Sequence, residues 1–592
     1  MTAGNKNLNF QRGTIRAAQL LQHFGPGAIV DLPEGSFITN AIDQWSFKNQ
    51  YLIREEDHDA VVNALGGKTV RLLNNNPDSI RAKVSRFPIW RFCPNCGSMT
   101  DSPRKHLCTN PKCEPLGIKY APMRFITVCR KGHISDFPWV KWAHQDRSLC
   151  DRPLLRLMTD SGTMSSSYKT MRVKCSNCDA PPVSLARIKE KGELERVTGK
   201  TCAGTKPWIL NHQSEECSAE MTVALRGETK LHIPNIQSVI TLPLKTTSHE
   251  LIYQELDKKY DMIKEGWFTL PEEAKGVLIK AFLPSQDWTD EEIQKGITYL
   301  NNNRLLSEVE ASTIRQRELS AWKHTKIAPL QEKDCQAESV MIPEKWAPYI
   351  SHIARVDLMR EVRALTSFNR LDYADSFIKK AAADGISIFN SSKSWYPGVE
   401  VFGEGIFIEL NREMLDEWEN RSAVINVFGD QIKRFNQKRI HRQQSEVELL
   451  PRHLLLHTFS HALIRALSET SGYSSTSLRE RLYYENGAAS ILIHTAEGDS
   501  ESSLGGLIEL SNPDKMSLMI QRAIELCEYC SSDPTCLEGG QEHKSAACHC
   551  CLFLSETSCE WNNELLDRRT LNNRLSDEFL SYFDFYNFNN FK

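Results

Sequence analysis

The chain has 592 residues, of which 40% are hydrophobic and 25% are charged. This length excludes a single compact domain, because one hydrophobic core stops growing well before it, and we expect about three or four domains. The ordinary composition excludes a fibrous repeat and long disorder. The formal net charge of −3 excludes electrostatic binding of DNA by the whole molecule, so any contact with nucleic acid must be local.

The N-terminus and the cysteines together predict a cytoplasmic protein. No apolar run follows the first charged residues, and no later stretch reaches the roughly 18 apolar residues that a membrane span needs. The chain has 18 cysteines, and 17 of them lie in two regions, 93–217 and 527–559. Because cytosolic thiols stay reduced, cysteines spaced this closely indicate metal ligands, whereas disulfides would require a secreted chain.

Residues 1–90 are predicted to form a β-containing region. A short amphipathic stretch precedes a Gly-Pro-Gly turn at 25–27, and residues 28–32 follow it with the pattern of a strand. Residues 79–92 place basic side chains among apolar ones in an imperfect, strand-like alternation.

The first cysteine cluster opens a predicted zinc-ribbon region at residues 91–230. A Cys-x-x-Cys pair followed by glycine forms a tight turn that points two thiolates at one ion, and a second pair completes the tetrahedron. The four-residue gap in the second pair is within the range of structural zinc sites. The predicted ligands are Cys93, Cys96, Cys108 and Cys113.

The second cluster has the same opening turn and a wider closing pair. Its predicted zinc ligands are Cys175, Cys178, Cys202 and Cys217, with His212 as a possible substitute. Because the closing pair is widely separated, the alternative is that Cys202 and Cys217 are small buried side chains without a metal.

Between these clusters, Cys129 and His133 are four residues apart. This spacing could begin a metal site or form a Cys/His nucleophile pair. No third group that would orient His133 is recognisable, and Trp139 and Trp142 indicate a packed element. We therefore expect His133 to be a hydrogen-bonded structural residue.

Residues 231–395 are predicted to be mainly helical. Apolar positions recur at three- and four-residue spacing between 248 and 330, and residues 344–367 carry apolar side chains on one face and charges on the other. Residues 396–411 then predict a hairpin, in which two runs of β-branched and aromatic residues flank Gly403-Glu404-Gly405.

An amphipathic helix is predicted between 412 and 445, and it ends in a basic face. This face is the best local candidate for contact with DNA phosphates, because cations on a helix bind the backbone without reading sequence. A solvated helix face is the alternative, since charge runs on helices are usually just exposed. The basic residues are Lys433, Arg434, Lys438, Arg439 and Arg442.

Two enzyme motifs are incomplete. The Gly-Gly-Lys-Thr sequence at 66–69 lacks the leading glycine of a phosphate-binding loop, since Val62 stands there, so the chain is not expected to be an ATP-driven motor. Three histidines recur every four residues near one helix face, but Thr458 stands where a zinc protease has its glutamate. Packing at a helix interface is therefore favoured over a metal-dependent nuclease or hydrolase. These histidines are His453, His457 and His461.

The third cluster has more cysteines than one tetrahedral zinc ion can bind. It contains Cys527, Cys530, Cys536, Cys548, Cys550, Cys551 and Cys559, with His543 and His549 among them. The predicted ligands are Cys530, Cys536, Cys548 and Cys551, with Cys559 as the replacement for one of them. A closed all-thiolate site leaves no position for water, so this zinc would stabilise the fold and not catalyse a reaction.

The C-terminal sequence carries a resemblance to a known family. Residues 457–483 and 491–510, followed by DPTC, AACHCC and ETSCEWNNELLDRR, look like the DrmB family of the DISARM anti-phage systems. The sequences FGPGAIVDLP at 24–33, REVRALTSFNRL at 360–371 and GEGIFIEL at 403–410 also resemble this family, so the resemblance covers most of the chain. It includes a C-terminal zinc-binding domain that the family shares with MrfA-type helicases.

The resemblance implies a companion subunit of DrmA, a helicase-like ATPase, with the pair binding DNA beside other DISARM components. It assigns no catalytic residue, so we expect a non-catalytic, zinc-binding subunit. The family's C-terminal cysteines correspond to Cys530, Cys536, Cys548, Cys551 and Cys559. A free-standing zinc-ribbon DNA-binding protein is the remaining alternative. The expected fold is multidomain α+β, with zinc ribbons in the N-terminal half, a helical middle, and an α/β zinc-binding domain at 396–592.

Overall fold

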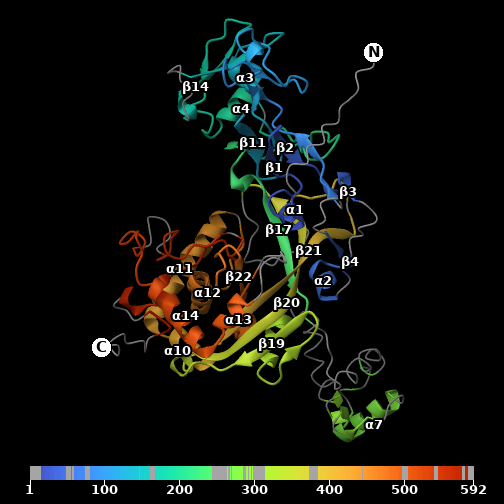
Figure 1. Ribbon diagram of the computed structural model, residues 1–592, viewed down its shortest axis with the longest axis vertical. Coiled ribbons are helices and arrows are strands. Elements are labelled where there is room, and N and C mark those ends of the chain that lie inside the picture. Colours follow the sequence, from blue (N-terminus) through green and yellow to red (C-terminus); the bar gives the residue numbers. More distant parts are fainter. Residues whose placement is uncertain are drawn as a thin grey trace. The chain divides into compact units, whose positions relative to one another are not determined.

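The structure is a computed structural model that describes most of the chain (Figure 1). The described residues are 15–47, 55–56, 59–73, 80–145, 147–159, 167–199, 201–242, 256, 263, 267, 270–283, 288–290, 292–294, 296–297, 314–371, 385–391, 393–442, 444–495, 505–538, 545–555, 557–575 and 580–583. Two compact units form, each from two stretches of chain: Met1–Val239 with Glu361–Val401, and Ile240–Arg360 with Phe402–Lys592. Both contain helices and strands, so the fold is mixed α+β as predicted.

The first unit begins with small antiparallel sheets and two short helices. Their elements are α1 (Ala17–Leu21), β1 (Ile29–Leu32), β2 (Gly35–Thr39), β3 (Ser46–Phe47), α2 (Asp59–Ala64), β6 (Ile80–Arg81) and β7 (Val84–Arg86). The strand predicted at 28–32 is confirmed as β1, which pairs with β2. Gly27 is required before it, because its φ is +83° and a Cβ would lie 2.4 Å from the ring of Phe368. The stretch 79–92 forms short strands instead of one, and Pro88 stands between two of them.

The next segment of the first unit surrounds a core of aromatic side chains. Its elements are β8 (Arg91–Phe92), β9 (Met99–Thr100), β10 (Ala121–Pro122), β11 (Phe125–Cys129), β12 (Ile134–Asp136), α3 (Trp139–His144), β13 (Leu155–Thr159), β14 (Met171–Cys175), β15 (Val183–Ser184), α4 (Glu193–Thr198) and β16 (Met221–Leu225). β11 pairs antiparallel with β16, with Cys129 opposite Met221. β13 and β14 form a hairpin with Leu155 opposite Cys175. Trp139 and its neighbours are buried in this core, as the sequence predicted.

Two long strands, β20 (Ile350–Asn369) and β21 (Trp395–Leu410), continue from one unit into the other. They belong to the largest sheet of the described chain. In this sheet β17 (Ile233–Ile240) pairs with β20, and β5 (Thr69–Leu72) runs parallel to β21 with β4 (Glu55–Glu56) beside it.

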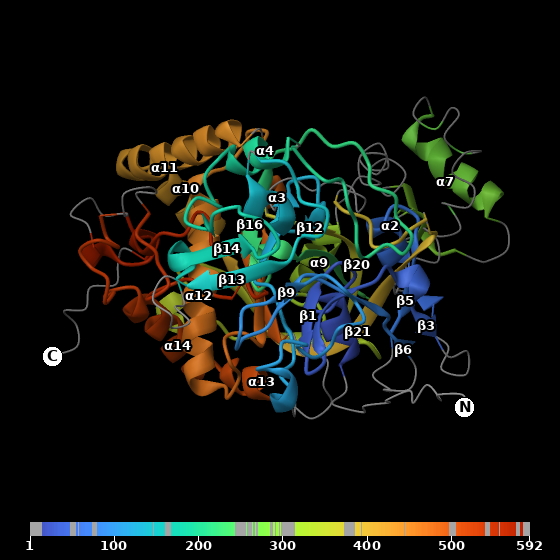
Figure 2. The same ribbon diagram turned by 90° about the horizontal axis from the view of Figure 1, so that it is seen from above.

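The second unit packs helices against the antiparallel strands β18-β19-β20-β21-β23-β22. Its further elements are β18 (Leu330–Gln331), β19 (Cys335–Val340), α10 (Arg412–Glu419), α11 (Ser422–His441), α12 (Pro451–Thr470), β22 (Leu478–Tyr483), β23 (Ser490–Thr495), α13 (Gly506–Leu510) and α14 (Pro513–Leu526). Helix α12 contacts α11, α14, β22 and β23, and Figure 2 shows it beside α14. Most of its side chains are therefore buried.

The helix predicted at 344–367 is wrong, because these residues mostly belong to strand β20. Both faces of this strand are buried along its second half, so its sequence lacks the two-residue alternation that marks a half-exposed strand. The region 231–395 is thus not mainly helical where it is described: β17, β19 and β20 lie there with helices α7 (Glu272–Phe282) and α9 (Ile314–His324). The helical pattern at 248–255 falls outside the described residues.

The hairpin predicted at 396–411 is also wrong, because Trp395–Leu410 form one continuous strand. Its central glycines permit close approach of the neighbouring strand β23 and do not form a turn. A Cβ on Gly403 would lie 2.8 Å from the carbonyl oxygen of Thr495, and one on Gly405 would lie 2.8 Å from that of Ile493.

The helix predicted between 412 and 445 is present as two helices, α10 and α11. Asn411 begins the first of them, since its side-chain oxygen accepts hydrogen bonds from the N–H groups of Glu413 and Met414. The chain leaves the helical path at Asn420 and Arg421 before α11 begins. Among the described helices, none is long and apolar enough to cross a membrane.

The close strand contact at Gly405 predicts a selective effect of an added methyl group. Gly405→Ala should lower the free energy of unfolding by about 1–3 kcal/mol, because the Cβ would overlap a backbone oxygen that cannot move away alone. Gly429→Ala on α11 is the control. A Cβ there meets nothing within 4 Å, and alanine should stabilise the helix by about 0.5–1 kcal/mol. Denaturant unfolding of the full-length variants measures both, and equal midpoints would contradict the strand pairing.

Candidate metal centres

Among the residues that the structure describes, five groups of four side chains place their donor atoms within 4.8 Å of one another. All 18 cysteines are free thiols. Four of the groups contain three or four cysteines, and each is named here after its first member. They are the Cys93 centre (Cys93, Cys96, Cys108, Cys113), the Cys129 centre (Cys129, His133, Cys202, Cys217), the His144 centre (His144, Cys150, Cys175, Cys178) and the Cys530 centre (Cys530, Cys536, Cys548, Cys551).

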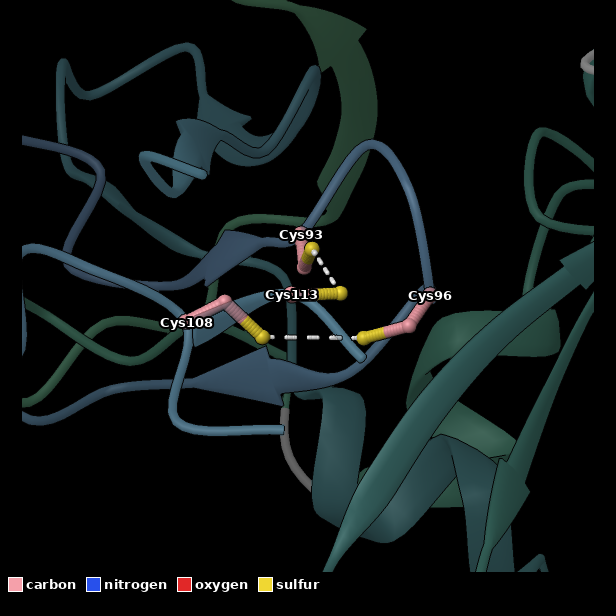
Figure 3. Close-up of side chains that lie close together, drawn as sticks. All are labelled: Cys93, Cys96, Cys108 and Cys113. Carbon is pink, nitrogen blue, oxygen red and sulfur yellow. Dashed lines mark hydrogen bonds between the residues drawn. The ribbon is translucent and has the colours of Figure 1, made fainter. Parts of the chain in front are cut away.

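The Cys93 centre matches the four ligands predicted from sequence, and Figure 3 shows their sulfurs pointing toward one another. The Sγ–Sγ distance is 3.8 Å between Cys93 and Cys113 and 3.6 Å between Cys96 and Cys108. A tetrahedral zinc ion with Zn–S bonds of about 2.3 Å requires Sγ–Sγ distances of about 3.7 Å. The thiols therefore already have the spacing of a zinc site.

The backbone around the Cys93 centre explains why the thiols converge. Gly97 has a φ of +73° and its N–H donates to the carbonyl of Cys93 at 2.9 Å, which closes the Cys-x-x-Cys turn. A Cβ on Gly97 would lie 2.1 Å from the carbonyl oxygen of Leu157. The buried core around the Cys93 centre consists of three of its cysteines, with Ile118 and Tyr120 packed against them. Metal binding would therefore supply much of what a hydrophobic core supplies elsewhere.

The thiols of the Cys93 centre differ in acidity: burial raises the pKa of Cys93 to about 12, whereas the pKa of Cys108 is lowered. Burial by itself raises the pKa of Cys108, but hydrogen bonds from Ser98 and from the backbone at Asn110, together with the neighbouring thiols, lower the pKa to about 6. Because the thiolate is the form that binds metal, this direction fits a ligand.

The Cys129 centre lies where β11 and β16 meet. Nδ1 of His133 is 3.4 Å from Sγ of Cys129 and 3.7 Å from Sγ of Cys202. Its other ring nitrogen, Nε2, is 2.5 Å from a carboxylate oxygen of Glu215. A carboxylate on the second nitrogen is the usual companion of a metal-binding histidine, because it fixes the ring orientation. Lys206 and His133 lower the pKa of Glu215 to about 2, so this carboxylate is charged.

The His144 centre lies at the end of α3 and beside the β13–β14 hairpin. Nδ1 of His144 donates to the carbonyl of Val140 at 2.7 Å, which leaves the lone pair of Nε2 for the thiols. Nε2 is 3.5 Å from Sγ of Cys150 and 3.5 Å from Sγ of Cys178. Sγ of Cys150 is 3.7 Å from Sγ of Cys175, again the spacing of a tetrahedral thiolate site.

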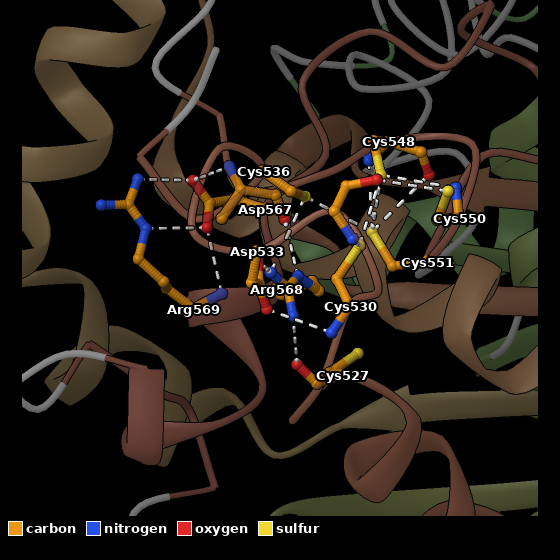
Figure 4. Close-up of polar contacts among 12 residues, drawn as sticks. Cys527, Cys530, Asp533, Cys536, Cys548, Cys550, Cys551, Asp567, Arg568 and Arg569 are labelled. Atoms are coloured by element: carbon orange, nitrogen blue, oxygen red, sulfur yellow. Dashed lines mark hydrogen bonds and ion pairs between the residues drawn. The ribbon is translucent and has the colours of Figure 1, made fainter.

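The Cys530 centre lies in the C-terminal segment and is drawn in Figure 4. The Sγ–Sγ distance is 3.4 Å between Cys530 and Cys548 and 3.8 Å between Cys536 and Cys551. Arg568 is fully buried beside it and donates to Asp533 at 2.7 Å and to the carbonyl of Cys527 at 3.2 Å. The guanidinium thus holds the loop that carries two of the ligands in place.

Comparisons with known proteins match an N-terminal and a C-terminal part of the chain, and each part contains at least one cysteine-rich centre. A family model described as a domain of unknown function, DUF8724, matches residues 16–233. The MrfA Zn-binding domain matches residues 459–552, which include the whole Cys530 centre. The DISARM protein DrmB of Bacillus paralicheniformis is 29% identical to the chain over 517 residues, and the match covers 84% of this chain and 90% of that protein.

The chain is a homologue of the DISARM protein DrmB.

Zn²⁺ is the cofactor that these findings indicate, because the matched domain is a zinc-binding domain and the Cys₄ groups have the matching geometry. The predicted fold class is borne out at the level of a mixed α+β chain with cysteine-rich sites in its N-terminal half and C-terminal region. The other cysteines of the third cluster lie outside the Cys530 centre: Cys527 is buried, Cys550 is exposed and Cys559 lies beside His457. His543 falls outside the described residues.

The structure does not bring together the second group predicted from sequence. Cys175 and Cys178 lie with His144 and Cys150, whereas Cys202 and Cys217 lie with Cys129 and His133. The alternative ligand His212 belongs to neither group. Strand register is the reason, since the pairing of β11 with β16 closes an outer loop and the pairing of β13 with β14 closes an inner one. Each loop therefore gathers its own set of ligands, one nested inside the other along the chain.

The basic face predicted on α11 is only partly exposed. The side chain of Lys433 is 76% exposed and that of Arg442 is 60% exposed, and they lie 3.5 Å from Asp430 and 3.3 Å from Glu564 respectively. Arg439 is buried and donates to the carbonyl of Ser445 at 2.8 Å, so it belongs to the fold. Arg434 and Lys438 are partly buried. A phosphate contact here remains a prediction, and Arg439 is not placed to make it.

The separation of the Cys129 and His144 centres can be tested by counting bound metal. Cys175→Ser and Cys202→Ser should each remove about one zinc equivalent, because a tetrahedral site needs all four ligands. The double variant should remove about two equivalents. The exposed Cys550→Ser is the control and should remove none. Elemental analysis of the purified full chain gives the counts, and a double variant that loses only one equivalent would show that these cysteines share one ion.

Proposed function

We propose that the chain is a non-catalytic subunit of a DISARM complex that binds the helicase-like ATPase DrmA and helps the complex hold DNA. The observation that carries this proposal is the match to the DISARM protein DrmB along 90% of that protein's length. A match that covers 84% of the chain extends well beyond either of the two matched domains, so it is not the resemblance of one shared domain.

The chemistry of the centres supports a structural role. Catalytic zinc sites keep one position for water or substrate, whereas each cysteine-rich centre here gathers four protein ligands. The chain also lacks a complete phosphate-binding loop, since Val62 replaces the leading glycine. Energy from ATP would therefore have to come from the partner.

The proposed DNA contact uses the exposed basic side chains near the end of α11. Lys433 and Arg442 extend into solvent and make only weak, screened ion pairs with surface carboxylates. Phosphates can replace such carboxylates at little cost, because the cations are already hydrated and mobile. This contact would be independent of sequence and would complement a helicase that tracks along DNA.

Co-purification tests the proposed partner. The chain is co-expressed with the neighbouring helicase gene, only this chain carries an affinity tag, and the eluate is analysed by size-exclusion chromatography. The proposal predicts a stable complex of the two chains. A tagged chain that elutes alone while the helicase is soluble contradicts it. DNA affinity of the isolated chain equal to that of the pair would favour the alternative of a free-standing DNA-binding protein.

Replacing Lys433 and Arg442 together with alanine should weaken DNA binding by the complex. Each lost phosphate contact should reduce the slope of log affinity against log salt by about 0.9, so the double variant should lose about two units of slope. Fluorescence anisotropy with a labelled duplex at several salt concentrations measures this. The control is Lys515→Ala, which removes another exposed lysine, on α14. An unchanged slope in the double variant would exclude the contact.

A further inference from the structure

A fifth group of donor atoms lies in the second unit, outside the cysteine-rich centres. It is named here the His457 centre and consists of His457, His461, Glu480 and Cys559. All four side chains are buried, and those of both histidines and of Glu480 are 0% exposed. Two of its members, His457 and Cys559, lie just outside the region matched by the MrfA Zn-binding domain.

Three elements bring these side chains together. His457 and His461 are one turn apart on α12, and their ring centroids are 4.5 Å apart. Glu480 lies on β22, which packs against α12. The N–H of Glu480 donates to the carbonyl of Ser558 at 3.1 Å, and this contact holds Cys559 beside the carboxylate.

The nitrogen–oxygen distances within the group are those of a tetrahedral metal site. Nε2 of His457 is 3.2 Å from Sγ of Cys559 and 3.3 Å from a carboxylate oxygen of Glu480. Nε2 of His461 is 3.4 Å from the same oxygen. Zinc bonds to nitrogen and oxygen of about 2.0–2.1 Å require ligand separations of about 3.3–3.4 Å, and a sulfur ligand lengthens them slightly.

The surroundings orient the donor atoms toward a common point. Nδ1 of His461 donates to the carbonyl of Leu552 at 2.9 Å, so Nε2 carries the lone pair, and it makes no hydrogen bond within the described part of the chain. Sγ of Cys559 accepts hydrogen bonds from the N–H groups of Trp561 at 3.3 Å and Asn563 at 3.1 Å, as a thiolate would. A buried ring nitrogen in this state is costly unless a ligand binds to it.

Charge balance favours a divalent cation. In a metal-bound state, the carboxylate and the deprotonated thiol would contribute two negative charges, and two neutral imidazoles would contribute none. Burying these charges without compensation would be strongly unfavourable, whereas one divalent ion neutralises them. The mixture of nitrogen, oxygen and sulfur donors is one that zinc accepts.

We propose that the His457 centre binds one zinc ion in a closed, structural site. The ion would connect α12, β22 and the segment that carries Cys559. It would also lie close to the Cys530 centre along the chain, since Leu552, which orients His461, directly follows the ligand Cys551. Because all four positions are filled by buried side chains, the site leaves no place for water, and hydrolysis is not its role.

The first test is the number of zinc ions bound to the full chain. Native mass spectrometry should find five metal ions in the wild-type protein, one for each group. Cys559→Ser should lose one of them. The control is His453→Gln, on the same helix one turn earlier, where the ring packs against Tyr484 and Trp561 and takes no part in the group. This variant should keep all five ions.

A second measurement does not depend on any variant folding. An anomalous difference map at the zinc edge, from crystals of the wild-type chain, should show a peak between the four side chains of the His457 centre. No peak there, with peaks at the cysteine-rich centres, would overturn the proposal. Either result is separate from the proposed DISARM function, because it concerns metal content and not binding of the helicase.

Discussion

Cysteine sulfurs that meet at 3.6–3.8 Å take the place of a hydrophobic core at the Cys93 centre. At the Cys93 centre the buried core is made of cysteines, with only Ile118 and Tyr120 packed against them. Four thiolates at this spacing would repel one another without a cation, so the zinc ion indicated here would be part of the fold. Such an ion would brace the tight turn at Gly97 and the loop between Cys108 and Cys113, in addition to their backbone hydrogen bonds.

Metal binding at the other cysteine-rich centres would stabilise loops of the chain in the same way. Ions at the nested Cys129 and His144 centres would fix the outer and inner loops of the segment between β11 and β16, and an ion at the Cys530 centre would fix the segment after α14. Carboxylates and carbonyls orient the metal-facing histidines, as Glu215 does for His133 and Val140 for His144. These contacts fix the orientation of the histidine rings, which suits the structural role proposed for the centres.

Local spacing predicted the centres whose ligands lie close together, and it missed those whose ligands meet through strand pairing. The Cys93 and Cys530 groups were visible because each lies within one short stretch of sequence. Cys175 and Cys202 belong to different groups because of how two pairs of strands are aligned, and the sequence does not reveal that alignment. His457 and His461 showed helical spacing, but Cys559 is 102 residues from His457. The sequence of β20 predicts a helix because burial on both faces removes the alternation that identifies a strand.

Hydrogen exchange before and after stoichiometric removal of zinc tests most directly whether the ions are part of the fold. The account predicts that amides at the Cys-x-x-Cys turn, such as Gly97, lose protection when the metal leaves. Amides in the middle of β20 should keep theirs, because the sheet and not an ion holds them. If the metal-free chain exchanges like the metal-bound one at Gly97, the cysteine clusters close without an ion and the central claim is contradicted.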